Sequence, residues 1–215
     1  MTTEKKTKRN AMKTGIHAFV LLDRTGSMSS RWNEAITSVN AYVEELKKRA
    51  TNCLVTLACF DGHNGTQFNI LRNAMPISQW KTLAKDEVDP RGDTPLLDSV
   101  MRLITLSRES KAKRVALVVM TDGEENASTE VKKEDVQKAL AQATKKGWQT
   151  VFLGVDFDAF GDRRGVGGTG IPSNYVAGTT VASFADATSG IAANTAIYFL
   201  TGSQTTSHIR KYGKK

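Results

Sequence analysis

Five residues with oxygen-bearing side chains are spaced along the sequence so that a folded sheet could gather them into one site. They are Asp23, Thr25, Ser27, Thr94 and Asp122. The first three follow one apolar run, Thr94 precedes an amphipathic run, and Asp122 follows the most apolar run of the chain. Two carboxylates and three hydroxyls form an all-oxygen ligand set, which suits Mg²⁺, Mn²⁺ or Ca²⁺ and not zinc. The sequence therefore predicts a site for a hard divalent cation, with Mg²⁺ as the first choice.

Three of these residues also have a simpler explanation that needs no metal. Thr94 before Pro95 would make a good helix N-cap, with the proline at the first helical position. Asp122 and Gly123 form a common turn pair, and Asp23 could cap the helix that follows it. Each alternative is reasonable alone, but their joint occurrence in three segments favours the metal site.

The spacing of apolar residues predicts the elements that would position these side chains. Strands are expected over 16–22, 54–60, 115–120 and 151–155, with a hairpin partner over 66–77 and a short strand near 175–177. Helices are expected over 32–50, 95–107 and 132–146, and over 180–196 with an interruption at Gly190. Strands that alternate with helices of this length indicate βαβ units.

The fold class that follows is α/β. It is a doubly wound, mostly parallel sheet with helices on both faces and one antiparallel edge strand. Ligands of such sheets bind at the carboxyl ends of the strands, near the point where strand order reverses. Since Asp23 and Asp122 each come at the end of an apolar run, we expect both at this edge.

The three segments resemble the metal-ion-dependent adhesion site of von Willebrand factor A domains. The family pattern is Asp-x-Ser-x-Ser, followed by a distant Thr and a distant Asp. Asp23, Thr25 and Ser27 match the first element, with threonine in place of the first serine. Thr94 and Asp122 match the other two elements in the same order. The threonine keeps the hydroxyl, so this departure from the pattern should cost little.

The resemblance covers roughly residues 14–200 and implies a Rossmann-like fold. The stretches Asp-Arg-Thr-Gly-Ser-Met-Ser, Thr-Asp-Gly-Glu-Glu-Asn-Ala and Gly-Trp-Gln-Thr-Val-Phe-Leu-Gly are similar to the intracellular bacterial and phage branch. By resemblance, the three hydroxyls would face the metal, and the two aspartates would bind it directly or through water. The resemblance also implies a protein partner that supplies an Asp or Glu carboxylate to the ion.

The net charge of +8 is carried by the two ends of the chain. Residues 1–14 hold five basic residues against one acid, and residues 210–215 hold four basic residues and no acid. We therefore expect basic tails over 1–13 and 203–215 on either side of one domain, 14–202, that is close to neutral. The interpretation we favour is that the tails are solvated and disordered, although such tails could also contact nucleic acid weakly and without sequence preference.

The remaining composition points to a cytoplasmic protein. Cys53 and Cys59 fall in one expected strand segment about 20 Å apart, too far for a disulfide between them. Small buried thiols of this kind are typical of a reducing compartment. No apolar run reaches the ~20 residues of a membrane span, and a signal peptide is not expected.

The function favoured by the sequence is a metal-dependent protein-interaction module. The alternatives are a nucleic-acid- or ribonucleoprotein-associated protein that uses the basic tails, a structural component of a phage particle, and a hydrolase whose metal activates water. The neutral body disfavours nucleic-acid binding. His17, His63 and His208 are scattered and form no triad with a serine, so we expect no enzymatic activity.

Overall fold

The computed structural model describes residues 15–122, 125–154, 174–177 and 181–204. The expected tail 1–13 and residues 205–215 of the other tail lie outside these ranges. Among the helices within these ranges, none is long and apolar enough to cross a membrane.

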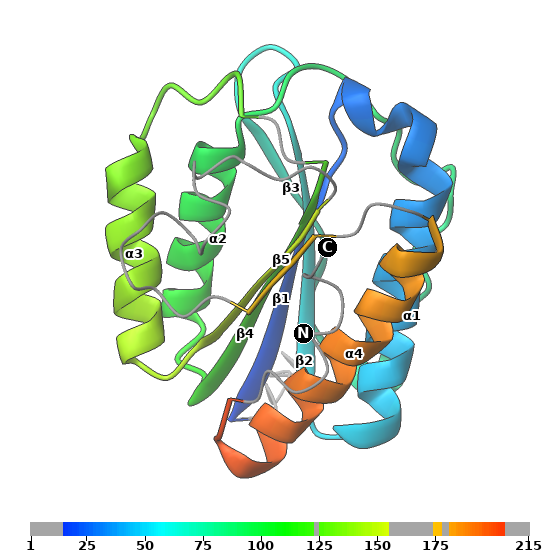
Figure 1. The fold of residues 1–215 in the computed structure, drawn as a ribbon, viewed down its shortest axis with the longest axis vertical. Coiled ribbons are helices and arrows are strands. Elements are labelled where there is room, and N and C mark those ends of the chain that lie inside the picture. Colours follow the sequence, from blue (N-terminus) through cyan, green and yellow to red (C-terminus); the bar gives the residue numbers. More distant parts are fainter. Residues whose placement is uncertain (1–14, 123–124, 155–173, 178–180, 205–215) are drawn as a thin grey trace, which may run out of the picture.

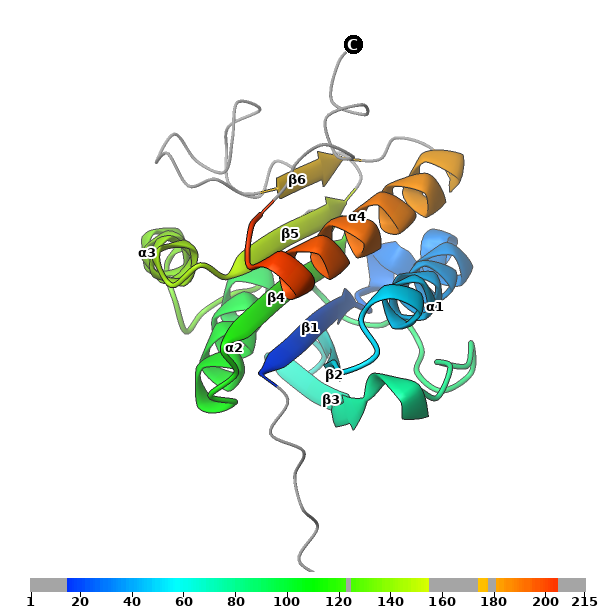
Figure 2. The ribbon, with the colours of Figure 1, turned by 90° about the horizontal axis from the view of Figure 1, so that it is seen from below.

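Six strands form one sheet in the order β3-β2-β1-β4-β5-β6. The strands are β1 (Ile16–Asp23), β2 (Leu54–Asp61), β3 (Gln67–Pro76), β4 (Arg114–Thr121), β5 (Gln149–Gly154) and β6 (Asn174–Ala177). All neighbouring pairs are parallel except β2 and β3, which form an antiparallel hairpin at one edge (Figure 2). This confirms the predicted mostly parallel sheet with one antiparallel edge strand.

Helices cover both faces of the sheet (Figure 1). The helices α1 (Trp32–Arg49) and α4 (Val181–Thr201) lie on one face, and α2 (Leu96–Glu109) and α3 (Lys133–Lys145) lie on the other. Two short 3-10 helices, η1 (Gly26–Arg31) and η2 (Ile77–Gln79), complete the described elements. The arrangement confirms the predicted doubly wound α/β class.

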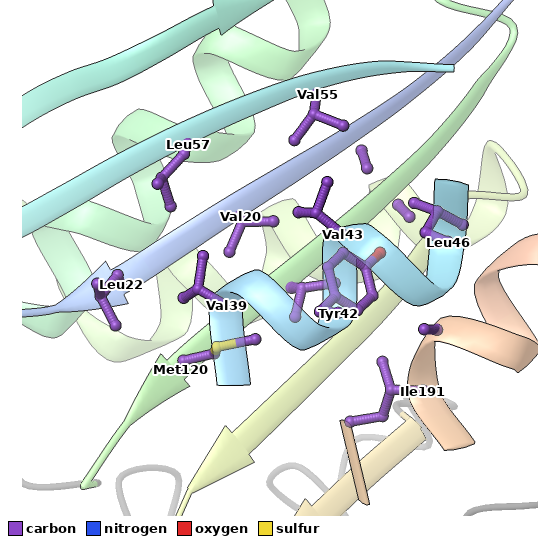
Figure 3. Close-up of a cluster of buried hydrophobic side chains, with 14 of the residues drawn as sticks. Val20, Leu22, Val39, Tyr42, Val43, Leu46, Val55, Leu57, Met120 and Ile191 are labelled. Carbon is purple, nitrogen blue, oxygen red and sulfur yellow. The ribbon is translucent and has the colours of Figure 1, made fainter. Parts of the chain in front are cut away.

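The core consists of two apolar layers, one on each face of the sheet. In β1, Val20 and Leu22 point toward α1 and α4, whereas Phe19 and Leu21 point toward α2 and α3. Figure 3 shows the first layer, in which Val39 and other residues of α1 pack against the central strands. Burial on both faces explains why the central strands read as continuous apolar runs.

The last helix differs from the prediction. We expected an interruption at Gly190, but α4 runs without a break from Val181 to Thr201. A glycine in a helix interior costs about 1 kcal/mol. Beyond it, Ile191 and Phe199 are buried in the same apolar layer as α1, and this burial offsets the cost. Tertiary packing therefore overrides the local signal.

A buried histidine marks the amino-terminal edge of the sheet. The Nε2 atom of His17 lies 2.9 Å from the Thr56 hydroxyl, which also accepts a hydrogen bond from the Ala74 backbone N–H (3.0 Å). Ala74 has a positive φ of 44° and lies in the part of β3 where the register with β2 shifts. His17 thus supports a bulge in the edge strand, far from the carboxyl ends of the strands.

Candidate metal centre

Asp23 ends β1 with a fully buried carboxylate whose two oxygens are both hydrogen-bonded. The Thr25 backbone N–H donates to Oδ1 (2.8 Å), and the Thr121 hydroxyl donates to Oδ2 (2.6 Å). The second contact follows from the parallel register of β1 and β4, which places the ends of the two strands side by side. Asp23 is therefore held in one orientation at the carboxyl edge of the sheet.

Asp122 directly follows β4, and one of its carboxylate oxygens lacks a hydrogen-bond partner among the described residues. This atom, Oδ1, is buried. A buried acceptor without a partner costs free energy, and a carboxylate costs more than a neutral group. Burial raises the pKa of Asp23 to about 6, and the charge of Asp122 adds to this effect. A buried carboxylate whose charge is disfavoured by a neighbouring acid is an arrangement that a cation would stabilise.

The loop after β1 supplies two hydroxyls. The Thr25 and Ser27 oxygens lie 3.1 Å apart, with Thr25 buried and Ser27 exposed at the start of η1. This loop is joined to the loop before α2, because the Gly26 N–H donates to the Gly92 carbonyl (2.9 Å). The structure therefore brings the first element of the predicted site into contact with the second.

Thr94 is buried in the loop before α2 and connects this loop to the segment after Asp122. Its N–H donates to the Asn126 side-chain oxygen (2.8 Å), and the Asn126 N–H donates to its carbonyl (3.1 Å). The five predicted residues therefore lie at the end of β1 and in the loops after β1, before α2 and after β4, at one edge of the sheet. The loops are linked to one another by backbone hydrogen bonds.

The expected start of α2 is corrected by one residue. We expected Pro95 at the first helical position with Thr94 as N-cap, but the helix begins at Leu96 and no side chain caps it from the N-cap position. The backbone N–H groups of Leu97 and Asp98 instead donate to side chains of the segment that follows Asp122. The N-cap explanation of Thr94 is thereby weakened.

Two carboxylates that the sequence did not single out, those of Asp98 and Glu125, hold the segment 125–131. Asp98 accepts hydrogen bonds from the backbone N–H groups of residues 129, 130 and 131 and from the Thr66 hydroxyl, at 3.0 to 3.1 Å. Glu125 accepts from the N–H groups of Leu97 and Ser128 and from the Ser128 hydroxyl. The acidic and amide residues that follow Asp122 are visible in the sequence. Their pattern does not indicate which backbone groups Asp98 and Glu125 would bind.

The donor chemistry of the five residues fits a hard cation. Within the described residues there is no group of three or more His, Cys, Asp or Glu side chains that could hold a metal ion. A site for zinc or another borderline metal is thus not found in these parts of the chain. The candidate centre instead consists of two carboxylates and three hydroxyls. A bound cation would explain why the buried Oδ1 atom of Asp122 has no hydrogen-bond partner among the described residues.

Comparisons with known proteins place this fold. A family model for the von Willebrand factor type A domain matches residues 19–189. No curated protein matches the chain. Among solved structures, the chain is similar to the PilB minor pilin from Streptococcus sanguinis, with a TM-score of 0.63, 14% identity, and coverage of 87% of this chain and 63% of the pilin.

Two further structures have the same fold. One is described as von Willebrand factor type A from Catenulispora acidiphila (TM-score 0.60, 12% identity, 84% of this chain and 42% of that chain). The other is the manganese-loaded TRAP protein of Plasmodium vivax (TM-score 0.50, 16% identity, 66% and 57%). The chain thus spans less than two thirds of each of these three proteins. Since the family model covers most of the sequence, the chain belongs to the von Willebrand factor type A domain family.

Proposed function

We propose that this protein binds one divalent cation, Mg²⁺ or Mn²⁺, and uses it to engage an acidic group of a protein partner. The ligands would be Asp23, Thr25, Ser27, Thr94 and Asp122. The observation that carries the proposal is the buried Oδ1 atom of Asp122, which has no hydrogen-bond partner among the described residues and lies near a second buried carboxylate. The family to which the chain belongs consists of protein-interaction modules that often depend on a metal ion.

The proposed ligands have different roles in the site. Asp23 is already held by Thr25 and Thr121, so it is positioned before any ligand arrives. Ser27 is exposed, which leaves its hydroxyl on the side from which a partner would approach. A divalent cation coordinated largely by neutral hydroxyls would retain affinity for an external carboxylate. A fold neighbour, the TRAP protein of Plasmodium vivax, is manganese-loaded, which supports this choice of ion.

Binding rather than catalysis is part of the proposal. Of the described histidines, His17 lies at the opposite edge of the sheet and His63 is exposed in the β2–β3 turn. We further propose that the protein acts in the cytoplasm, as in the intracellular bacterial and phage branch. The two cysteines, Cys53 and Cys59, are buried and unpaired, which is consistent with a reducing compartment. The nucleic-acid alternative depends on tails that lie outside the described residues.

The metal site is tested by titration calorimetry and thermal unfolding with Mg²⁺ or Mn²⁺ and with EDTA. A ligand specific for the folded state stabilises it by ~2.7 kcal/mol at a hundredfold excess over its dissociation constant. The melting temperature of the wild type should therefore rise with metal, and Asp122→Asn and Thr94→Ala should lose most of the rise. Asp86→Asn and Thr105→Ala, which change exposed residues elsewhere, are the matched controls. An equal rise in all five proteins would exclude the site.

A further inference from the structure

A cluster of three charged side chains, Arg24, Asp61 and Arg91, lies beside the loop that carries Thr25 and Ser27. The positive and negative charges of this cluster do not balance. The Asp61 carboxylate at the end of β2 is fully buried and is shared by two guanidinium groups. Arg24 approaches Oδ2 with Nε at 2.7 Å and Nη2 at 2.6 Å, and Arg91 approaches Oδ1 with Nε at 3.3 Å. One negative charge against two positive charges leaves an excess of one positive charge beside the loop that carries Thr25 and Ser27.

Arg24 and Arg91 differ in how many of their guanidinium nitrogens form hydrogen bonds within the described residues. Arg24 is buried, and its Nη2 also donates to the Asn69 side chain (3.1 Å), so it fastens the end of β1 to the β2–β3 hairpin. The side chain of Arg91 is 46% exposed and uses only Nε. Its two terminal nitrogens make no hydrogen bond with any described residue. A guanidinium fork that is held at Nε and open at both Nη atoms is suited to a planar oxyanion from outside.

The backbone beneath Arg91 is also fixed. Its N–H donates to the Arg24 carbonyl (2.8 Å), and the next residue, Gly92, accepts from Gly26. Gly92 has a φ of +68°, and a Cβ at this position would lie 2.6 Å from the His63 nitrogen, so only glycine allows the close approach of the two turns. Arg91 is therefore anchored at both its backbone and its Nε, and little conformational freedom is lost when it binds a ligand.

Neutralisation of Asp61 does not by itself account for Arg91. Arg24 already forms a close, buried ion pair with this carboxylate, and the His63 N–H donates to Oδ1 at 2.9 Å. The nearest acid on the same loop is Asp93, which is exposed, and no ion pair joins it to Arg91 within the described residues. The positive end of Arg91 thus faces solvent at the rim of the candidate metal site.

We propose that Arg91 is a second anion-binding point next to the metal centre, and that the partner segment carries two acidic residues close together in sequence. One carboxylate would bind the metal ion and the other would meet the open fork of Arg91. This inference depends on the proposed function, since the first carboxylate needs the metal. It assigns to Arg91 a role in partner specificity and leaves metal binding to the five residues named above.

The test is an NMR titration of the ¹⁵N-labelled full chain with Mg²⁺ and three synthetic Gly-Ser peptides. The peptides contain no Asp, one Asp, or two Asp separated by one to three residues. We expect the two-Asp peptide to bind wild type about three- to tenfold more tightly than the one-Asp peptide, the range of a partly exposed charge-assisted pair. The Arg91 Nε–H signal should move only with the two-Asp peptide.

Matched variants separate this role from a structural one. Arg91→Gln should remove the preference for the two-Asp peptide and leave one-Asp binding and the Mg²⁺ affinity unchanged. Arg91→Lys, which keeps the charge and loses the fork, should retain part of the preference. Arg102→Gln is the control, because Arg102 is also a partly exposed arginine, and its ion pair is with Glu130.

The outcomes distinguish the two proposals. Metal-dependent binding of both Asp peptides with equal affinity, or a preference that survives in Arg91→Gln, would overturn the role of Arg91 and leave the proposed function intact. If neither Asp peptide binds at millimolar concentration in the presence of Mg²⁺, the proposed carboxylate recognition fails, and the role of Arg91 fails with it.

Discussion

Two aspartates at the same edge of the sheet, the buried Asp98 and the half-buried Asp122, have opposite surroundings. Asp98, in the first turn of α2, is 1% exposed and accepts four hydrogen bonds from backbone and hydroxyl groups. Asp122, at the end of β4, has a buried oxygen with no hydrogen-bond partner among the described residues. A carboxylate can leave water at tolerable cost only if protein donors or a cation replace its hydration. Asp98 uses the first solution, and Asp122 is suited to the second.

In the proposed site, the residues that hold the loops differ from the residue that would bind the cation. The carboxylates of Asp98 and Glu125 fasten the segment 125–131 to the start of α2, and Asn126 within that segment bonds to Thr94. The satisfied acids therefore hold the loops that carry the unsatisfied one. A binding centre built this way is positioned before its ligand arrives, which lowers the entropy lost on binding.

The largest effect is expected from removing the satisfied acid. Asp98→Ala leaves three backbone N–H groups and the Thr66 hydroxyl without their acceptor, so the free energy of unfolding should fall by about 3–5 kcal/mol. Urea unfolding followed by circular dichroism measures this loss. The same loss is expected with Mg²⁺ and with EDTA, after allowance for metal binding. A loss below about 1 kcal/mol would mean that the segment 125–131 is held by other contacts.

His17 is a buried base at the opposite edge of the sheet. Burial lowers the pKa of His17 from its ordinary value of 6.5 to about 4. The unfolded chain therefore takes up a proton near pH 6.5 while the folded chain does not. The stability contribution is complete above pH 6.5 and falls as the pH drops toward 4, by about 3 kcal/mol in total.

Urea unfolding of wild type and His17→Gln between pH 4 and 7 measures this contribution. The difference in unfolding free energy between the two proteins should change with pH in this window and be constant above it. Parallel curves over the whole range would show that His17 is protonated in the folded state as readily as in the unfolded chain.

The smallest change in unfolding free energy is expected at Asp122, and it should be a stabilisation rather than a loss. Asp122→Asn removes a half-buried charge that opposes the buried charge of Asp23, so without metal the free energy of unfolding should rise by about 1 kcal/mol. The same substitution at Asp98 should destabilise the protein, since an amide has one acceptor oxygen where the carboxylate uses two. Thermal unfolding in EDTA compares the pair. Destabilisation of similar size in both variants would remove the distinction between the two aspartates.

Much of this fold was predictable because its signals are local. The apolar run 16–22 and the helix that begins at Trp32 were predicted within one or two residues of the observed β1 and α1. The alternation of such elements then indicated the parallel sheet and the edge at which the five candidate ligands meet. The prediction for α4 was wrong at Gly190, since burial of the residues beyond it depends on α1, which is far away in the sequence.

The supporting contacts of the site were not predictable from the sequence. The ion pair of Arg24 and Asp61 joins residues 37 positions apart, and the hydrogen bonds between Asp98 and the segment 125–131 join residues about 30 apart. Neither pair has a periodic or motif signal, because the partners are set by strand order and loop path rather than by neighbouring residues. The positions of Asp23 and Asp122 at the sheet edge could be predicted, since the ends of apolar runs mark the ends of strands.

The bulge at Ala74 bears on how the protein behaves at high concentration. β3 is an edge strand of ten residues that includes a large exposed apolar side chain, Ile70, and such edges are templates for strand-to-strand aggregation. The positive φ of Ala74 and the register shifts beside it interrupt the regular spacing of backbone donors and acceptors that an incoming strand must match. Through Thr56, the buried His17 supports this irregularity, which makes the edge a poorer template for an added strand.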